Sequence, residues 1–325
     1  MRTLAIIFIS LLYSSSQLFA QLPDAKLKKM VVNHDIEALT QFNHKFKEGK
    51  PEEDGYKNIY KEFDKDGNVT KEMHYRQGEV SQRMTYKYDK KGNMTEFVNY
   101  SVRKDELKYR QTIAYNEDNN KVLENRYNGS EHFQIYYDYH ENGKLAKIRK
   151  MKLIPALNKY ELQDKRVFTH DQNVTTIKVM DPDDQVVKKI VNKYDDRGNL
   201  IEFNEYEPNG DRIKQISYAF NEDNMITKEE KYQKGNFIYS KSYDYDKEGN
   251  LVEVQKEQPE DKYVISKVYE YNKKNLAKEM WFDDMAEQYS HKKFVYNDDG
   301  ILKEVEVYYA LYQYRILYRF DYEYR

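Results

Sequence analysis

The chain has 325 residues, no cysteine and 34% charged residues, and its 33 tyrosines favour folded strands over disorder. A formal net charge of −2 gives no long-range field for nucleic acid or an anionic membrane. With only 12 glycines and 6 prolines, the sequence excludes collagen and lacks the usual phosphate-binding loops. We therefore expect no nucleic-acid partner and no cofactor.

The first 20 residues predict a cleaved signal peptide. Arg2 precedes an apolar run at 4–13, and the segment ends at Ala20, a small residue suited to cleavage. Polar residues 14–17 interrupt the run, so it is too short for a membrane anchor. No cysteine follows for lipid attachment. We expect a mature chain that starts near Gln21, has no membrane span after signal cleavage, and is secreted or periplasmic.

Residues 21–55 lack the tyrosine pattern of the rest of the chain. They are interpreted as an N-terminal cap or linker, in which residues 25–46 form one short helix or a cap on the first hairpin. Repeat arrays need such a cap because their end units expose apolar surface.

An aromatic-centred repeat occupies residues 56–325. Its nine-residue core is Tyr86-Lys87-Tyr88-Asp89-Lys90-Lys91-Gly92-Asn93-Met94, and residues 243–251 repeat it closely. The anchoring aromatic recurs every 24 to 29 residues, at Phe63, Tyr88, Tyr115, Tyr139, Phe168, Tyr194, Phe220, Tyr245, Tyr271 and Tyr296.

Each copy carries the residues of a hairpin turn. Asp or Asn follows the aromatic in eight copies, and three positions later nine copies have Gly or Asn, which tolerate positive φ, with Gln172 as the exception. Six of these are glycines that we expect to be structural: Gly67, Gly92, Gly143, Gly198, Gly249 and Gly300. A type I turn followed by a left-handed residue is a common hairpin connection, so each repeat predicts a β-hairpin.

The side chains that flank the turns alternate between aromatic and charged residues, as half-exposed strands do. The predicted fold is all-β, a repetitive antiparallel hairpin meander of about twenty strands. Because twisted open sheets of that width curl, we expect a curved or spiralling open sheet of solenoid type, with a thin aromatic and aliphatic core.

The repeat resembles the YD or RHS repeats of bacterial secreted and surface proteins, whose pattern is Tyr-x-Tyr-Asp-x-x-Gly-Arg-Leu. The resemblance covers roughly residues 56–325 and rests on residues 86–94, 193–200 and 243–251. In this chain Asn takes the place of the Arg. The resemblance implies a hairpin-built shell, which in that family can enclose a C-terminal toxin domain; here the repeat-like sequence continues to the last residue.

No motif points to a catalytic or metal site. The seven histidines share no ligand spacing, and the acidic turns lack the ligands of a calcium loop. Candidate binding residues are aromatic. Trp281 is interpreted either as a sugar platform or as a core filler, and Tyr309, Tyr312 and Tyr314 lie in a cluster with more aromatics than one strand face buries.

The leading hypothesis is an exported, non-catalytic binding or scaffold protein for a glycan or polypeptide of the cell envelope or exterior. Two alternatives stay open: an RHS-related shell or carrier without its toxin domain, and a hydrolase with a cryptic acidic site.

Overall fold

The computed structural model describes residues 24–325 except 260–261, 274 and 283–288. The expected signal peptide and Gln21 lie outside the described residues. The described chain contains one α-helix, α1 (Asp24–Asn33), one short 3-10 helix, η1 (Pro155–Leu157), and 23 strands. The strands are β1 (Ile36–Lys47), β2 (Lys50–Pro51), β3 (Tyr56–Phe63), β4 (Val69–Arg76), β5 (Glu79–Tyr88), β6 (Met94–Ser101), β7 (Glu106–Tyr115), β8 (Lys121–Tyr127), β9 (His132–Tyr139), β10 (Leu145–Ile154), β11 (Lys159–Asp171), β12 (Val174–Met180), β13 (Val186–Tyr194), β14 (Leu200–Tyr206), β15 (Arg212–Phe220), β16 (Ile226–Gln233), β17 (Asn236–Tyr245), β18 (Leu251–Gln258), β19 (Lys262–Asn272), β20 (Asn275–Trp281), β21 (Ser290–Tyr296), β22 (Leu302–Tyr309) and β23 (Tyr314–Tyr324).

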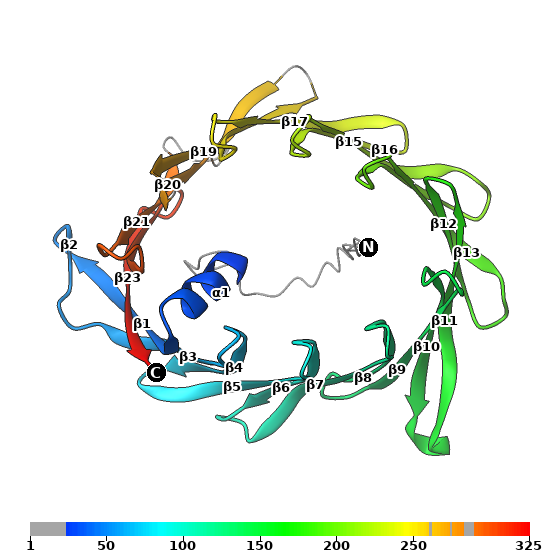
Figure 1. Ribbon diagram of the computed structural model, residues 1–325, viewed down its shortest axis with the longest axis horizontal. Coiled ribbons are helices and arrows are strands. Elements are labelled where there is room, and N and C mark those ends of the chain that lie inside the picture. The colour runs from blue at the N-terminus through cyan, green and yellow to red at the C-terminus, as the bar shows by residue number, and fades with distance from the viewer. Residues whose placement is uncertain (1–23, 260–261, 274, 283–288) are drawn as a thin grey trace.

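The strands close into an antiparallel barrel, seen end-on in Figure 1. From β3 to β23, each strand pairs with the next strand along the chain, and β1 pairs with both β3 and β23. Strand β2 pairs only with β1, so 23 − 1 = 22 strands form the ring. The all-β expectation is confirmed.

The expected open, spiralling, solenoid-type sheet is wrong. The cause lies in residues 36–47, which form the closing strand between the first and last repeats instead of part of a cap or a helix. The same closure overturns the description of the architecture as a hairpin-repeat array of the RHS or YD kind. Closure removes the exposed edges that an open sheet would present to other chains.

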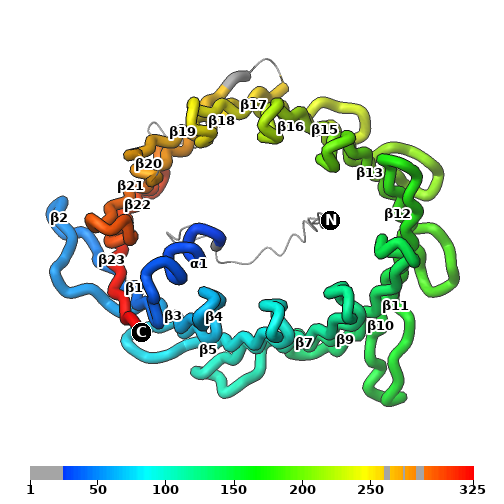
Figure 2. The backbone as a smooth tube through the Cα atoms, viewed as in Figure 1, coloured from blue at the N-terminus to red at the C-terminus, as the bar shows by residue number. Residues whose placement is uncertain are grey.

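The connections divide into two rims. The repeat turns, such as those between β3 and β4 and between β5 and β6, lie at one end of the barrel, here called the turn rim. The hairpins that join successive repeats, such as β22–β23, lie at the opposite end, called the loop rim. In Figure 2 the turn-rim connections curl toward the barrel axis, whereas loop-rim connections such as β10–β11 project outward.

The repeat turns are held by their first and last residues. Asp89 Oδ1 accepts hydrogen bonds from the backbone N–H groups of Lys91 (2.8 Å) and Asn93 (2.9 Å), and its Oδ2 accepts one from Asn93 Nδ2 (2.9 Å). The same bonds recur between Asp64 and Asn68, Asp195 and Asn199, and Asp246 and Asn250. The Asn after the glycine is therefore the partner of the turn carboxylate. The six turn glycines have φ between 74° and 84°.

A ladder of tyrosine hydroxyls ties successive repeats together at the turn rim. Six anchoring tyrosines, and Tyr322 of β23, each donate a hydroxyl hydrogen bond of 2.5–3.1 Å to a backbone carbonyl in the first two residues of the preceding even-numbered strand. The pairs are Tyr88–Val69, Tyr115–Met94, Tyr139–Lys121, Tyr245–Ile226, Tyr271–Leu251, Tyr296–Leu276 and Tyr322–Leu302. Where the anchor is Phe168, His170 Nε2 contacts the Leu145 carbonyl instead, at 2.8 Å. Neighbouring repeats are connected by the chain only at the loop rim. The tyrosine hydrogen bonds connect them at the turn rim as well.

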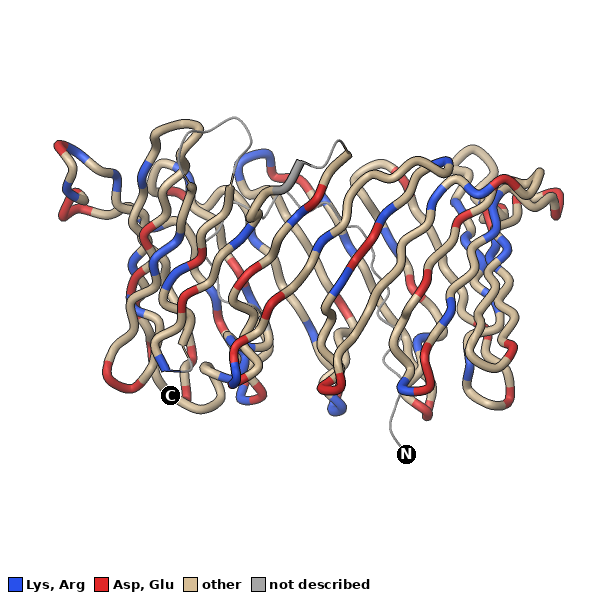
Figure 3. Tube along the Cα trace, turned by 90° about the horizontal axis from the view of Figure 1, so that it is seen from above, with Lys and Arg blue, Asp and Glu red and all other residues tan. Residues whose placement is uncertain are grey.

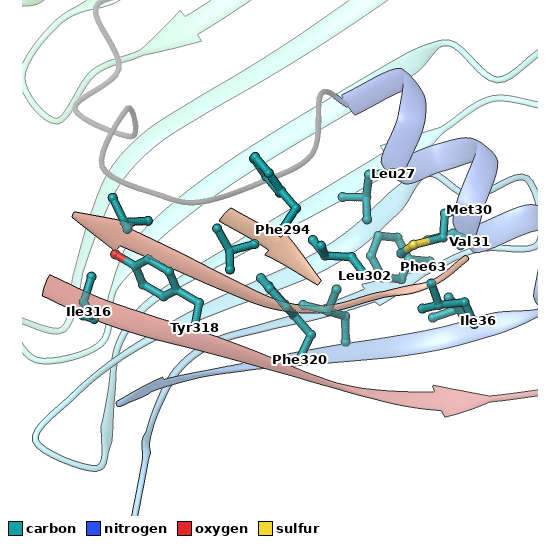
Figure 4. Packing of buried hydrophobic residues seen from close by; sticks show 14 residues of the cluster. Leu27, Met30, Val31, Ile36, Phe63, Phe294, Leu302, Ile316, Tyr318 and Phe320 are labelled. Atoms are coloured by element: carbon teal, nitrogen blue, oxygen red, sulfur yellow. The ribbon is translucent and has the colours of Figure 1, made fainter. Parts of the chain in front are cut away.

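Helix α1 lies inside the ring and defines the inner face of the wall (Figure 1). Its apolar stripe of Leu27, Met30 and Val31 packs on Phe63 and Leu302 in the main hydrophobic core (Figure 4). The spacing of the three residues places them on one helix face. No helix in the described part of the chain has the length and apolar character needed to cross a membrane.

Strand pairing extends the inner face around the ring, because directly paired residues of neighbouring strands point to the same side of a sheet. Leu39, which belongs to the core under α1, pairs with Lys61, and Lys61 pairs with Glu72. Glu72 pairs in turn with Met84. The anchoring aromatics, such as Tyr88 four residues after Met84, belong to this inner face. Residues one position away face outward.

Charged residues are distributed along the whole wall (Figure 3). On the outer face they form cross-strand ion pairs, including Arg110–Glu96 (2.7 Å), Lys193–Glu202 (2.9 Å) and Arg319–Glu304 (2.9 Å). These ion pairs account for part of the high charge content of the strands.

Candidate functional site

The structure brings three of the four predicted aromatic residues together at the loop rim. Tyr309 and Tyr314 are directly paired at the end of the β22–β23 hairpin, with ring centroids 6.3 Å apart and planes at 22°. Trp281, at the end of β20, meets Tyr309 edge-on at 6.1 Å and 71°. Offset and edge-to-face arrangements at these distances are favourable for aromatic rings. Tyr312 lies in the turn of the hairpin and is 75% exposed.

Two further tyrosines extend this group. Tyr318 of β23 is buried, which raises the pKa of its hydroxyl, and the neighbouring phenols of Tyr309, Tyr314 and Tyr56 raise it further. Tyr56 opens β3 and reaches the group because β1 joins β3 to β23: Asn43 of β1 pairs with both Tyr56 and Tyr318. We call Tyr56, Trp281, Tyr309, Tyr314 and Tyr318 the rim aromatic patch.

The patch has a buried base and an exposed edge. Trp281 and Tyr309 pack against the main hydrophobic core, so the core-filler interpretation of Trp281 describes part of its environment. Tyr314 and Tyr56 are 44% and 43% exposed. Lys292 of β21 places its Nζ 5.6 Å from the Trp281 ring, a cation–π contact on the inner face. The edge therefore offers aromatic surface, with a cation beside it, to a ligand at the mouth of the barrel.

Sequence reasoning missed Tyr56 and Tyr318. Tyr318 lies in the same tyrosine-rich C-terminal segment as Tyr309 and Tyr314, but Tyr56 lies more than 250 positions away from it in the sequence. Only the closure through β1 places the two side by side. The period-two alternation of β23, in which Tyr314, Ile316, Tyr318 and Phe320 share a face, is the signal that identifies Tyr318.

The surroundings of several carboxyl groups in the wall lower their pKa. The groups are Glu72, Asp89, Glu96, Glu106, Glu124, Glu131, Asp195, Glu202 and Asp246. At Glu124, which is fully buried, burial alone raises the pKa, but the hydrogen bond from Arg126 and the charges of Lys121 and Arg126 outweigh it. A general acid for hydrolysis needs the opposite shift. No group of three or more His, Cys, Asp or Glu suited to a metal occurs among the residues that the structure describes.

No protein-family model matches the chain, and no curated protein matches it. Solved structures resemble it weakly. A porin-like protein from Bacteroides uniformis has a TM-score of 0.31 and 9% identity over 66% of this chain and 97% of that chain. The TcdB2-TccC3 structure without its hypervariable C-terminal region has a TM-score of 0.31 and 10% identity over 83% of this chain and 19% of that chain. A porin-like protein from Bacteroides vulgatus has a TM-score of 0.24 and 10% identity over 90% of this chain and 99% of that chain.

Proposed function

We propose that this protein is an exported, non-catalytic binding barrel that captures an extended glycan or polypeptide at its loop rim. The observation that carries the proposal is the rim aromatic patch, whose edge residues Tyr56 and Tyr314 are more than 40% exposed while its base is fixed in the main core. Rigid aromatic side chains supply large contact area at low cost in conformational entropy. An exported location, secreted or periplasmic, is inferred from the sequence of residues 1–20.

The outer face supports a barrel that stands in water. Ion pairs occupy the middle of outer strand faces, as at Lys228–Glu230 (2.7 Å) and Lys293–Glu306 (3.7 Å). A charged side chain at the mid-plane of a bilayer costs roughly 2–4 kcal/mol, and membrane barrels present an apolar outer band there. The main hydrophobic core and the anchoring aromatics lie on the inner face, beside charged residues, and the ion pairs interrupt any apolar band on the outer face.

The barrel is wide enough to admit a polymer. Strands about 4.8 Å apart and tilted by about 40° give a ring of 22 strands a diameter of roughly 45 Å. Side chains reach about 5 Å from the wall, which is half the spacing of packed sheets, so those of opposite walls do not meet.

The test is a binding comparison by isothermal titration with neutral and acidic oligosaccharides and an unfolded, carboxymethylated polypeptide. The double variant Tyr56→Ser, Tyr314→Ser removes the exposed edge and keeps Tyr309, whose contact with the core makes it a stability residue. We expect at least a tenfold loss of affinity. Tyr324→Ser is the matched control, because Tyr324 is 53% exposed near the opposite rim.

Two results would overturn the proposal. One is that the wild-type protein binds none of these probes. The other is that the double variant and the Tyr324→Ser control bind equally well, with unfolding midpoints that show both to be folded.

A further inference from the structure

Three lysines, one on each of the strands β16, β17 and β18, surround the ring of Tyr239 on β17. The Nζ atoms of Lys231, Lys241 and Lys256 lie 5.8, 4.7 and 5.9 Å from the centroid of the Tyr239 ring. The three lysines come from three successive strands: Lys231 pairs with Tyr239, and Lys241 pairs with Lys256. We call these four residues the lysine cluster.

The lysine cluster faces the lumen. Lys256 is two residues from Val254, which pairs with Lys267 of β19, and Lys267 pairs with Trp281 of the rim aromatic patch. Directly paired residues, and residues two apart on one strand, share a face. The cluster and the patch therefore line the same interior.

The cluster carries more positive than negative charge among the residues that the structure describes. Within that part of the chain, Glu229 is the one carboxylate at ion-pair distance from the cluster, 3.8 Å from Lys241, and it also accepts hydrogen bonds from the hydroxyls of Tyr239 and Tyr243. Lys231 and Lys256 form no ion pair with any residue in the described part of the chain. Lys214 of the adjacent β15, with its Nζ 5.2 Å from the Phe203 ring, adds another cation that forms no ion pair among those residues. Glu205 lies opposite Lys214 in the β14–β15 register, but its carboxylate pairs with Lys188 (2.5 Å).

Charges of one sign that converge on one ring repel each other, and the cation–π attraction offsets this only in part. A bound anion removes the repulsion. We propose that the lysine cluster binds an anionic polysaccharide inside the barrel, an inference that rests on the proposed function and names the class of its ligand.

The spacing and the chemistry favour a sugar polymer over nucleic acid. Adjacent strands are about 4.8 Å apart, so the positive charges of three lysines on successive strands are spaced by about the length of one sugar residue. The carboxylates of a polymer of sugar acids have a similar spacing. The cluster contains no Arg, whose fork is suited to phosphate. The inner face beside it carries half-buried Tyr218 and Tyr243, and the negatively polarised faces of such rings attract the C–H groups of sugars.

Affinity electrophoresis of the folded protein in gels containing polygalacturonate, dextran or single-stranded DNA tests the inference. The variant Lys231→Gln, Lys241→Gln, Lys256→Gln is compared with Lys189→Gln, Lys228→Gln, Lys293→Gln, which removes the same charge from the outer face. We expect wild-type protein to be retarded by polygalacturonate, with an effect that falls as salt rises. The inner variant should bind at least tenfold more weakly, and the outer variant should match wild type.

The lysine variants and the rim aromatic variant test the two proposals separately. Equal losses in the inner and outer variants, or tighter binding of the DNA than of polygalacturonate, would overturn the lysine cluster as a polysaccharide site. If Tyr56→Ser, Tyr314→Ser abolishes glycan binding while the inner lysine variant retains it, the proposed function stands and the lysine inference fails.

Discussion

Replacing Gly92 by Val tests the turn geometry without disturbing any packing. Gly92 has φ of 82°, its N–H donates to the Asp89 carbonyl (3.0 Å), and a Cβ added there meets nothing within 4 Å. The cost of the substitution is therefore backbone strain alone, about 1–2 kcal/mol for a left-handed residue with a side chain, and Val is among the least tolerant. Asn tolerates this conformation, so Gly92→Asn should cost less by about 1 kcal/mol.

Gly67 provides the contrasting site. Its φ is 74°, close to that of Gly92, but a Cβ would lie 2.8 Å from both the Lys28 carbonyl oxygen and Val32 Cγ2 of α1. Gly67→Asn must therefore displace α1 as well as strain the turn. We expect Gly67→Asn to be clearly more destabilising than Gly92→Asn, although the amino-acid change is identical.

Thermal unfolding followed by circular dichroism measures these differences. For a chain of about 300 residues the entropy of unfolding gives a shift of roughly 1.5 °C per kcal/mol, so Gly92→Val should lower the midpoint by about 2–3 °C. Equal midpoints for Gly92→Val and Gly92→Asn would refute the turn geometry. Equal midpoints for Gly67→Asn and Gly92→Asn would refute the docking of α1 on the first turn.

Three further predictions concern the hydroxyl ladder, acid stability and export. Tyr271→Phe removes the donor to the Leu251 carbonyl (3.0 Å) and should cost about 0.5–1.5 kcal/mol in denaturant titrations, whereas Tyr206→Phe, on the outer face, should be nearly neutral. Folding lowers the pKa of Glu124, so its stabilising contribution is present above the unfolded value of 4.5 and is lost as pH falls through the lower folded value. Glu124→Gln should therefore reduce the loss of stability between neutral and acidic pH. The same loss in the variant and the wild type would contradict this. N-terminal sequencing of exported protein should begin at or near Gln21, and an intact Met1 would contradict signal cleavage.

The local structure of the repeats could be predicted from the sequence because its determinants are local. The turn Asp or Asn and the residue of positive φ lie within four positions of each other, and strand alternation has a period of two. The role of Asn93 was not predicted, although its spacing is equally local. Its amide donates to Asp89, which explains why Asn follows the turn glycine in this chain.

Closure could not be predicted from the repeats, because it depends on a strand that carries none of their signals. Residues 36–47 are buried at most positions on both faces: Leu39 lies under α1, while the neighbouring Thr40 is 8% exposed. This pattern hides the alternation that marks a strand. The pairing partners are also remote, since Arg325 donates a hydrogen bond to the Phe63 carbonyl across 262 positions.

The candidate site was predictable only in part for the same reason. The tyrosine excess of residues 308–318 pointed to Tyr309 and Tyr314, and the single tryptophan pointed to Trp281. These residues share one face because of the register in which their strands pair. The sequence alone does not reveal that register. The lysine cluster was not predicted, because lysines occur on both strand faces and only the register separates the inner ones from the outer ones.

Engineered disulfides test the closed barrel most directly, because the native chain has no cysteine. Thr40 faces Asp321 and Gln41 faces Phe320 across the β1–β23 seam, within the Cα separation of under about 7 Å that a disulfide requires. At least one of the double variants Thr40→Cys, Asp321→Cys and Gln41→Cys, Phe320→Cys should oxidise within the monomer, with loss of both free thiols and faster migration on a non-reducing gel. In an open sheet of 22 strands these positions would be roughly 100 Å apart. Free thiols in both seam variants, as expected for the control Thr40→Cys, Glu202→Cys, would contradict the closed barrel.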